Sequence, residues 1–307
     1  MMRNTPLFIS LFCSLFLIAC SPEGSDDPSQ KGRTFAKSNL HVWAYEEYDA
    51  VDRTPEEHAQ ALVDLGITKA GYISRNAKRV SEFDAYLNTY RKAGIELVAV
   101  WTPIHTDTPM EEVQVREFFE VVDRYGLNIQ WWLTLEQDFD AMPEGERMDD
   151  ALARLRPLVE ETNRRGCRLV LYGHGPNRWF TQAENEIEIV ERLKAEMPSA
   201  KLGIVYNFHQ SHAQMDRLEA VMSKLQPHLV ALNLNGMRSD HTKIERIGRG
   251  DREREMIKIV VDSGWFGPTG IIAHDRNQDA KVTLQENLVG LKKILSELGY
   301  HEVAATY

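Results

Sequence analysis

The chain alternates eight times between a short apolar run and a longer amphipathic segment, and this alternation constrains its fold more than any other feature. The runs are rich in β-branched and aromatic residues, as buried strands are. They lie at Leu40–Ala44, Ile67–Ile73, Ile95–Trp101, Ile129–Leu135, Arg168–Tyr172, Leu202–Tyr206, Leu229–Leu234 and Thr269–Ala273. Repeated strand–helix units of this kind build a parallel sheet, and eight of them in about 270 residues predict a single-domain (β/α)8 TIM barrel.

Helix start and stop signals support the amphipathic segments. Four Thr-x-x-Glu sequences are typical of capping boxes, at Thr54/Glu57, Thr108/Glu111, Thr181/Glu184 and Thr283/Glu286. Glycines typical of helix ends follow five of the segments, at Gly66, Gly94, Gly126, Gly166 and Gly264. A doubly wound open sheet is the alternative fold, but no glycine-rich phosphate-binding sequence follows the first run.

The first 19 residues have the three parts of a secretory signal peptide: a charge at Arg3, an apolar stretch from Leu7 to Ile18 and the small Ala19. The stretch is about a dozen residues long, whereas a transmembrane helix, the alternative, needs roughly 20. The residues Leu17-Ile18-Ala19-Cys20 resemble the lipobox of bacterial lipoproteins. This resemblance implies that Cys20 is lipidated and becomes the first residue of the mature chain.

Three segments follow from this interpretation: a signal peptide at 1–19, a lipidated Cys20 with a flexible tether through 38, and a catalytic barrel at 39–307. The tether is polar and lacks apolar periodicity. Ser21, rather than Asp, follows the cysteine. By the same resemblance, this favours the outer membrane of a Gram-negative bacterium, with the protein facing the periplasm or the cell surface.

Charge and cysteine content narrow the range of partners. The net charge is −10, and losing Arg3 with the leader changes it to −11, which disfavours binding to a nucleic-acid backbone. The cysteines are Cys13 in the leader, Cys20 at the lipid site and Cys167 in the body. The mature body therefore cannot form an internal disulfide, and its stability must come from its core.

Polar residues gather where the predicted strands end. In a TIM barrel these positions form one ring around the active site. The ring includes Tyr45, Glu46, Glu47, Trp101, His105, Glu136, Gln137, Asp138, His174, Asn207, His209, His212, Asn233, Asn235, His274 and Asp275. Because side chains alternate along a strand, Asn207 and His209 share a face, as do Asn233 and Asn235, and both pairs can point into one cavity.

Histidines at three strand ends, close to a carboxylate, are what a catalytic divalent metal needs. We therefore predict one metal ion, Mn, Zn, Co or Mg, held by Glu136, His174, His209 and His274, with His212 as an alternative to His209. The competing interpretation is a metal-free pocket lined by the same polar residues.

Aromatic residues and amides supply the predicted sugar-binding surface. Trp101 and Trp179 lie beside strand-end turns and could stack on the apolar face of a sugar, and Asn207, Asn233 and Asn235 could bind its hydroxyls. Core packing is the better interpretation for most of the other tryptophans. Trp131 and Trp132 are adjacent on one strand, so at most one of them can enter the barrel.

A resemblance to a known superfamily rests on residues 169–275. The sequences LVLYGHGPNRWF, GIVYNFHQSHAQ, LVALNLNGM, IGRGDRE and GIIAHD are similar to those of xylose isomerase-like TIM barrels, in particular bacterial sugar phosphate isomerase/epimerase-type proteins. Sugar epimerases of this superfamily hold a divalent metal with Glu, Asp, His and Glu from successive strand ends, and the two Glu residues also move protons.

The resemblance can be carried over position by position. His174 takes the place of the first Glu, Tyr206 or Asn207 that of the Asp, Asn233 or Asn235 that of the His, and His274 that of the last Glu. His209 matches the His that follows the Asp in such enzymes. This chain therefore has imidazoles where the epimerases have their two proton-moving carboxylates.

These observations favour a metal-dependent, carbohydrate-active enzyme that removes a proton next to a sugar carbonyl. The predicted catalytic residues are Glu136, His174, His209 and Lys243, the last on the loop after the seventh strand, which Arg249 also flanks. Reprotonation would give an isomerase or epimerase. Loss of a β-substituent would give a lyase, as in superfamily members that cleave 3-keto-glycosides.

Two other classes of function remain open. A non-catalytic sugar-binding lipoprotein would use the aromatic pocket without needing three histidines. An endonuclease-IV-like phosphodiesterase would need more metal ligands and a basic groove, and the acidic charge and the anchor both argue against it.

Overall fold

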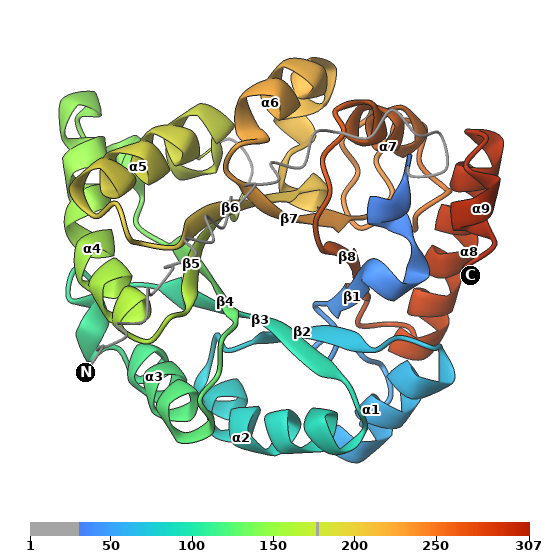
Figure 1. Cartoon of the computed structure of the whole chain (residues 1–307), viewed down its shortest axis with the longest axis horizontal. Coiled ribbons are helices and arrows are strands. Elements are labelled where there is room, and N and C mark those ends of the chain that lie inside the picture. The colour runs from blue at the N-terminus through green and yellow to red at the C-terminus, as the bar shows by residue number, and fades with distance from the viewer. Residues whose placement is uncertain (1–30, 176–177) are drawn as a thin grey trace, which may run out of the picture.

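The computed structural model describes residues 31–175 and 178–307 and shows a closed barrel of parallel strands inside a ring of helices (Figure 1). The strands are β1 (Leu40–Trp43), β2 (Lys69–Ile73), β3 (Glu96–Ile104), β4 (Gln130–Leu135), β5 (Arg168–Tyr172), β6 (Leu202–Asn207), β7 (Leu229–Leu234) and β8 (Thr269–Ile272). Each strand pairs in parallel with the next, and β8 pairs with β1. The predicted single-domain TIM barrel is confirmed.

The helices follow the strands in the order expected of strand–helix units. They are α1 (Pro55–Asp64), α2 (Ala77–Lys92), α3 (Val113–Tyr125), α4 (Glu144–Arg164), α5 (Ala183–Glu196), α6 (Leu218–Leu225), α7 (Glu253–Asp262), α8 (Ala280–Glu297) and α9 (His301–Ala304). Within residues 31–175 and 178–307, none of them combines the length and the apolar character needed to cross a bilayer.

The helix starts differ from the predicted ones at three of four positions. At Thr54 the capping box forms, with both of its hydrogen bonds present. The boxes predicted at Thr108 and Thr181 are wrong, because short 3-10 turns occupy Pro109–Glu111 and Trp179–Thr181 and the helices begin after them. The box predicted at Thr283 is also wrong, since α8 begins earlier, where the Asp279 side chain accepts a hydrogen bond from Lys281 N–H.

Two hydrophobic cores lie on the two sides of the strands. The outer core fills the space between strands and helices, and the inner core fills the barrel. Trp131 and Trp132 separate as predicted: Trp131 stacks on Phe118 of α3 with ring centroids 4.5 Å apart, whereas Trp132 points inward and lies 4.6 Å from Trp43. Apolar side chains thus form most of the inner core of the barrel.

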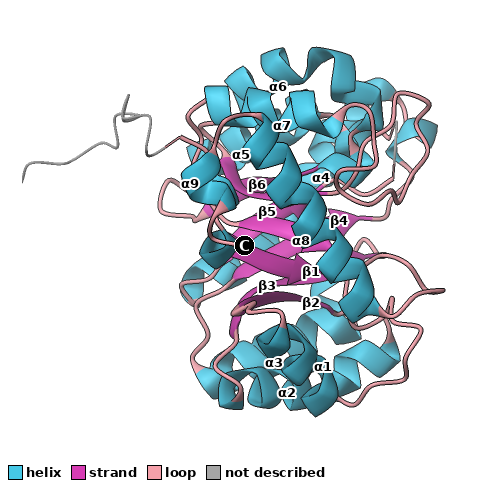
Figure 2. Ribbon diagram, turned by 90° about the vertical axis from the view of Figure 1, so that its right-hand side faces the viewer, coloured by secondary structure: helices cyan, strands magenta, loops and turns pink. Residues whose placement is uncertain are grey.

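Two 3-10 turns, η2 (Arg33–Phe35) and η3 (Lys37–Asn39), precede β1 and pack beside the start of β8. Phe35 is fully buried, and Thr34 Oγ1 and Asn39 Nδ2 both donate to Gly267 O, just before β8. Tyr307 Oη near the C-terminus, marked in Figure 2, donates to Phe35 O at 2.5 Å. Residues 33–38, which we expected in the tether, therefore pack on the barrel because Phe35 is an apolar anchor.

Candidate active site

A cavity opens at the carboxyl end of the strands, where a TIM barrel carries its active site. Its enclosed volume is about 40 Å³, and we call it the mouth cavity. It is lined by Trp43, Ala44, Tyr48, Ile73, Arg75, Trp101, Tyr172, His174, Asn207, His209, Gln210, Ile272 and His274. A shallower recess of about 300 Å³ adjoins it and shares Tyr48 and His274. Residues from β1, β2, β3, β5, β6 and β8 thus meet at one place.

Four aromatic side chains form the walls of the mouth cavity. Trp43 ends β1, Trp101 lies in β3 and Tyr172 ends β5. The Tyr172 ring lies 5.8 Å from that of Trp43 and 5.7 Å from that of Trp101, measured between centroids. Tyr48, on the loop after β1, packs edge-on against His274 at 3.8 Å. Such walls offer flat apolar faces that suit the C–H side of a sugar ring.

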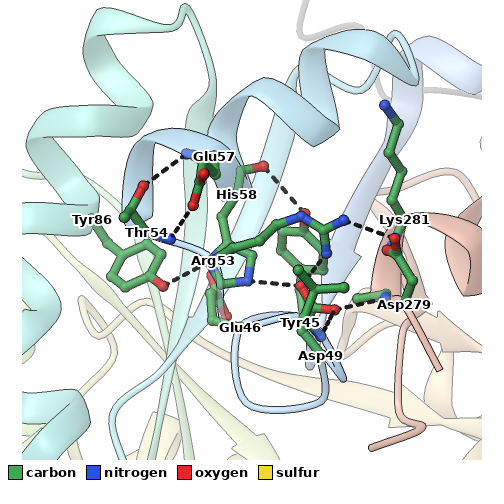
Figure 3. Close-up of polar contacts among 12 residues, drawn as sticks. Tyr45, Glu46, Asp49, Arg53, Thr54, Glu57, His58, Tyr86, Asp279 and Lys281 are labelled. Atoms are coloured by element: carbon green, nitrogen blue, oxygen red, sulfur yellow. Dashed lines mark hydrogen bonds and ion pairs between the residues drawn. The ribbon is translucent and has the colours of Figure 1, made fainter. Parts of the chain in front are cut away.

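A buried polar network fixes the loop that carries Tyr48 (Figure 3). The carboxylate of Asp49 accepts hydrogen bonds from Arg53 and from backbone N–H groups, and it lies 3.3 Å from His58 Nε2. Arg53 also donates to Asp279 at 2.8 Å, which ties the loop to the start of α8. Burial lowers the pKa of His58 to about 4, so its ring is neutral at neutral pH.

Glu136 and His174 form the most specific polar contact at the rim. His174 Nδ1 donates to Glu136 Oε1 at 3.0 Å, and Arg178 donates to Glu136 Oε2 at 3.2 Å. Burial opposes ionisation of this carboxyl, but the hydrogen bonds and charges of His174 and Arg178 outweigh it and lower the pKa of Glu136. Among the described residues, His174 Nε2 has no hydrogen-bond partner. The imidazole is therefore held by an ionised carboxylate with one nitrogen free.

Two further imidazoles line the mouth cavity. His209 and His274 lie with ring centroids 5.2 Å apart. Burial, reinforced by nearby His274 and Lys243, lowers the pKa of His209 to about 3. Burial, reinforced by Arg75 and Arg276, lowers the pKa of His274 to about 4. Both rings are therefore neutral at neutral pH and can donate or accept a hydrogen bond.

Asn207 connects the inner wall of the mouth cavity to the turn that follows β6. Its Oδ1 accepts from His209 N–H at 3.0 Å, and its Nδ2 donates to Tyr172 Oη. The prediction that Asn207 and His209 reach the same cavity is confirmed.

The predicted metal ligands lie around the mouth cavity, but their side chains do not converge on one common position. His174, His209 and His274 line the mouth cavity, whereas both oxygens of Glu136 are bonded to His174 and Arg178. In residues 31–175 and 178–307, no group of three or more His, Cys, Asp or Glu side chains has metal-binding spacing. The alternative ligand His212 is buried behind this wall, with Nδ1 3.2 Å from His209 O. The metal site stays a prediction.

Several predicted substrate-binding residues lie away from the mouth cavity. Asn233 is fully buried lower in the barrel, beside His41, and Asn235 donates to Gly236 O. Trp179 packs on Phe139 at 5.1 Å, toward α5. None of these three side chains lines the mouth cavity in the described structure.

The loop after β7 brings Lys243 toward the site. Lys243 is half-buried, and its charge acts on both His209 and His212. Burial lowers its own pKa. In the described part of the chain its ammonium group makes no salt bridge, so it is available to a ligand. Arg249, in contrast, is paired with Glu286 at 3.0 Å.

Eight lining residues were not among the predicted site residues; those with polar or aromatic side chains are Trp43, Tyr48, Arg75, Tyr172 and Gln210. The rule that linked Asn207 to His209 would also have found Tyr172, since it lies two positions before His174. Arg75 follows β2, a strand end for which no residue was singled out. Cys20, the predicted lipidation site, lies outside the described residues.

Comparison with known proteins establishes the fold. No family model matches the sequence, and no curated protein matches it in sequence. The IolI protein with a bound zinc atom is 13% identical over 84% of this chain and 98% of its own, with a TM-score of 0.63. A 3-keto-D-glucoside 4-epimerase from E. coli is 13% identical over 84% of this chain and 100% of its own, with a TM-score of 0.60.

A D-psicose 3-epimerase, solved in the presence of D-fructose, is 12% identical over 85% of this chain and 99% of its own, with a TM-score of 0.59. At these identities the likeness shows a shared fold, the (β/α)8 TIM barrel.

Proposed function

We propose that the protein is a carbohydrate-active enzyme of the sugar isomerase or epimerase type, which moves a proton at the carbon next to a sugar carbonyl. The observation that carries this proposal is the His174–Glu136 pair at the aromatic mouth cavity. A carboxylate bonded to Nδ1 fixes the ring and its tautomer, and makes Nε2 the proton acceptor.

In this proposal His174 is the base. Its Nε2 takes the proton from the C–H group, and the electron pair of that bond moves toward the carbonyl oxygen to give an enediolate. The neutral His209 and His274 can donate to the sugar oxygens, and the aromatic walls hold the ring. Return of the proton from His174 to the neighbouring carbon, with transfer of the hydroxyl proton between the two enediolate oxygens, gives an isomer. Protonation of the original carbon on its opposite face by water, while His174 gives its proton to the solvent, gives an epimer.

The lining of the mouth cavity supports enolisation rather than hydrolysis of an unactivated glycoside. Ordinary glycosidases need two carboxyl groups about 5 to 9.5 Å apart. Among the described residues that line the mouth cavity there is no Asp or Glu. One oriented imidazole suffices to remove a single proton.

A divalent metal ion forms a further part of the proposal. The donor chemistry fits, because His174, His209 and His274 are imidazole ligands at one cavity and the buried His209 Nδ1 has no partner in the described structure. A bound ion would supply Lewis-acid polarisation of the carbonyl. The structural neighbour with a bound zinc atom is consistent with this part.

Solvent deuterium exchange tests the function. The full-length protein, purified without chelator, is incubated in deuterated water with D-fructose, D-psicose and methyl 3-keto-glucoside, and the sugars are followed by NMR. We expect deuterium at the carbon next to the carbonyl, with a loss of about 100-fold or more in His174→Ala. His301→Ala, at an exposed position of α9, is the control. Absence of exchange with every keto sugar would overturn the proposal.

The same spectra separate an isomerase from a lyase. In methyl 3-keto-glucoside the methoxy group on C1 is β to the C3 carbonyl, so a lyase would release free methanol. Isomerisation or epimerisation would keep the glycoside intact. Metal removal followed by the same assay, with elemental analysis of the protein, tests the ion. Undiminished exchange in the metal-free protein would exclude a role for it in this step.

We also propose that the protein is lipid-anchored through Cys20 in the cell envelope. The support is the Leu17-Ile18-Ala19-Cys20 sequence. Cys20→Ala should leave the protein either uncleaved or soluble in the periplasm, as fractionation would show, while Cys167→Ala should remain anchored. A Cys20→Ala protein that is cleaved and still membrane-bound would contradict lipid as the anchor.

A further inference from the structure

The hydroxyl of Tyr172 accepts two hydrogen bonds at the inner wall of the mouth cavity. Trp43 Nε1 donates to it at 3.4 Å, and Asn207 Nδ2 donates to it as well. The indole nitrogen can only donate. Tyr172 is at the end of β5, two residues before His174, and lines the mouth cavity.

The direction of the Asn207 bond is fixed by its neighbour. Asn207 Oδ1 accepts from the backbone N–H of His209 at 3.0 Å, so the amide cannot flip without losing this bond. The group that faces Tyr172 is therefore the NH2 group, which can only donate. Both contacts of the Tyr172 oxygen use its lone pairs, and neither uses its hydrogen.

The hydrogen of the Tyr172 hydroxyl thus remains unused. A phenol has an ordinary pKa near 10 and keeps its proton at neutral pH. Within residues 31–175 and 178–307, Tyr172 Oη donates to no acceptor. Tyr172 and its two donor residues, Trp43 and Asn207, all line the mouth cavity, so the unused O–H group lies where a ligand in that cavity can accept from it.

We propose that Tyr172 Oη–H is the hydrogen-bond donor to the substrate carbonyl oxygen and stabilises the enediolate. This inference rests on the proposed function and names the group that receives the developing charge. As His174 Nε2 takes the proton, the C–H electron pair forms the C=C bond and the carbonyl π electrons move to oxygen. Tyr172 keeps its proton and shortens its hydrogen bond to that oxygen, as donors in oxyanion holes do. The two bonds that it accepts polarise its O–H group and strengthen it as a donor.

Two variants test this role in the deuterium-exchange assay. Tyr172→Phe removes the donor and keeps the ring, so kcat for exchange should fall about 100-fold, with KM changed by less than about threefold. Asn207→Asp keeps the Tyr172 hydroxyl but puts a carboxylate oxygen in place of the NH2 group that donates to it. The Tyr172 O–H group should then donate to this oxygen and turn away from the cavity. We expect a similar loss of kcat in this second variant.

Tyr72→Phe is the matched control. Tyr72 lies in β2, is fully buried, and donates through its hydroxyl to Arg79 O at 2.7 Å on the outer side of the barrel. The control therefore loses a buried tyrosine hydrogen bond without touching the mouth cavity, and its exchange rate should stay within about twofold of the wild type. Circular dichroism of all variants checks the fold.

A readout without turnover separates this inference from the proposed function. The infrared carbonyl stretch of bound, 13C-labelled methyl 3-keto-glucoside should lie at lower frequency in the wild type than in Tyr172→Phe, because the hydrogen bond weakens the C=O bond. An equal stretch in both proteins, or wild-type exchange kinetics in Tyr172→Phe, would overturn the role of Tyr172 and leave the function intact. A wild type that shifts the stretch but exchanges no proton would support the Tyr172 contact and contradict the function. Failure of the wild type to bind the probe would overturn both.

Discussion

At the scale of single residues, both carboxylate oxygens of Glu136 are occupied by side chains of the same protein. One oxygen accepts from His174 and the other from Arg178, and the pKa of this carboxyl is lowered as a result. We predicted Glu136 from its place at a strand end, as a metal ligand and proton carrier. The contacts point to a supporting role in which the carboxylate orients an imidazole and raises its basicity.

Glu136→Gln should lower kcat for proton exchange about 10- to 100-fold, since a neutral amide cannot stabilise the imidazolium that forms when His174 takes a proton. The rate measurement needs a surface control. Glu188→Gln breaks an exposed pair with Arg192 on α5 and should leave kcat unchanged. Wild-type kcat in Glu136→Gln would remove the basis for His174 as an oriented base.

The residues of the site could be predicted in part, and the reason lies in barrel geometry. Alternation along a strand gives the face of each side chain, which correctly placed Asn207 and His209 in one cavity. It does not give height in the barrel. Asn207 and Asn233 are paired neighbours across β6 and β7, yet Asn233 lies below the mouth beside His41, because strands tilted by about 36° put paired residues at different levels.

At the scale of elements, the segment between β7 and α7 is organised by one buried carboxylate. Glu253, at the first position of α7, is 1% exposed and accepts hydrogen bonds from three backbone N–H groups. The donors are Met237 at 3.0 Å, Gly248 at 2.9 Å and Gly250 at 2.9 Å. A Cβ at Gly250 would lie 2.1 Å from Glu253 Oε2, so glycine is needed there for close approach.

Glu253→Gln should lower the free energy of unfolding by about 2 kcal/mol or more, because the amide NH2 group cannot accept from the backbone N–H groups that it would face. Urea unfolding measures this change. Glu255→Gln, two residues further along the same helix and 64% exposed at its side chain, should change the free energy by less than about 0.5 kcal/mol. Equal effects of the two substitutions would contradict the bonding role of Glu253.

The strands were predicted more accurately than the helix starts, for a physical reason. Each strand is an apolar run buried on both sides, and the predicted bounds of β5 and β7 agree with the structure. β3 runs further, to Ile104, because buried residues continue beyond Trp101. Helix starts depend on which of several polar residues caps the chain, and the 3-10 turns before α3 and α5 left no sign in the spacing of Thr and Glu.

At the scale of the whole molecule, buried neutral histidines link stability to pH. Burial lowers the pKa of His58 to about 4, well below the ordinary value of about 6.5 that the unfolded chain has. Between these values the unfolded state binds a proton at His58 and the folded state does not. The contribution of His58 to the free energy of unfolding is therefore fully present above about pH 6.5 and is lost as the pH falls toward 4. From pH 6 to pH 5, His58 should cost the wild type about 1 kcal/mol of unfolding free energy.

Urea unfolding of His58→Gln over the same pH range isolates this contribution. Between pH 6 and pH 5, the free energy of unfolding of the variant should fall by about 1 kcal/mol less than that of the wild type, whatever the stability of the variant at pH 7. Glu46 and Glu186, whose pKa values are raised by burial, contribute in the opposite direction in both proteins and cancel in the comparison. His301→Gln, at an exposed position, controls for loss of a histidine as such. Parallel pH profiles of wild type and His58→Gln would refute the linkage.

The packing of Phe35 and Asn39 against the start of β8 has a consequence for how the molecule would stand on a membrane. These contacts bring the chain into the barrel at the face opposite the mouth cavity. With the lipid that we propose on Cys20, the face that holds the amino ends of the strands would be turned toward the bilayer and the mouth cavity toward the water. The mouth cavity would then be open to dissolved sugars that diffuse near the membrane surface.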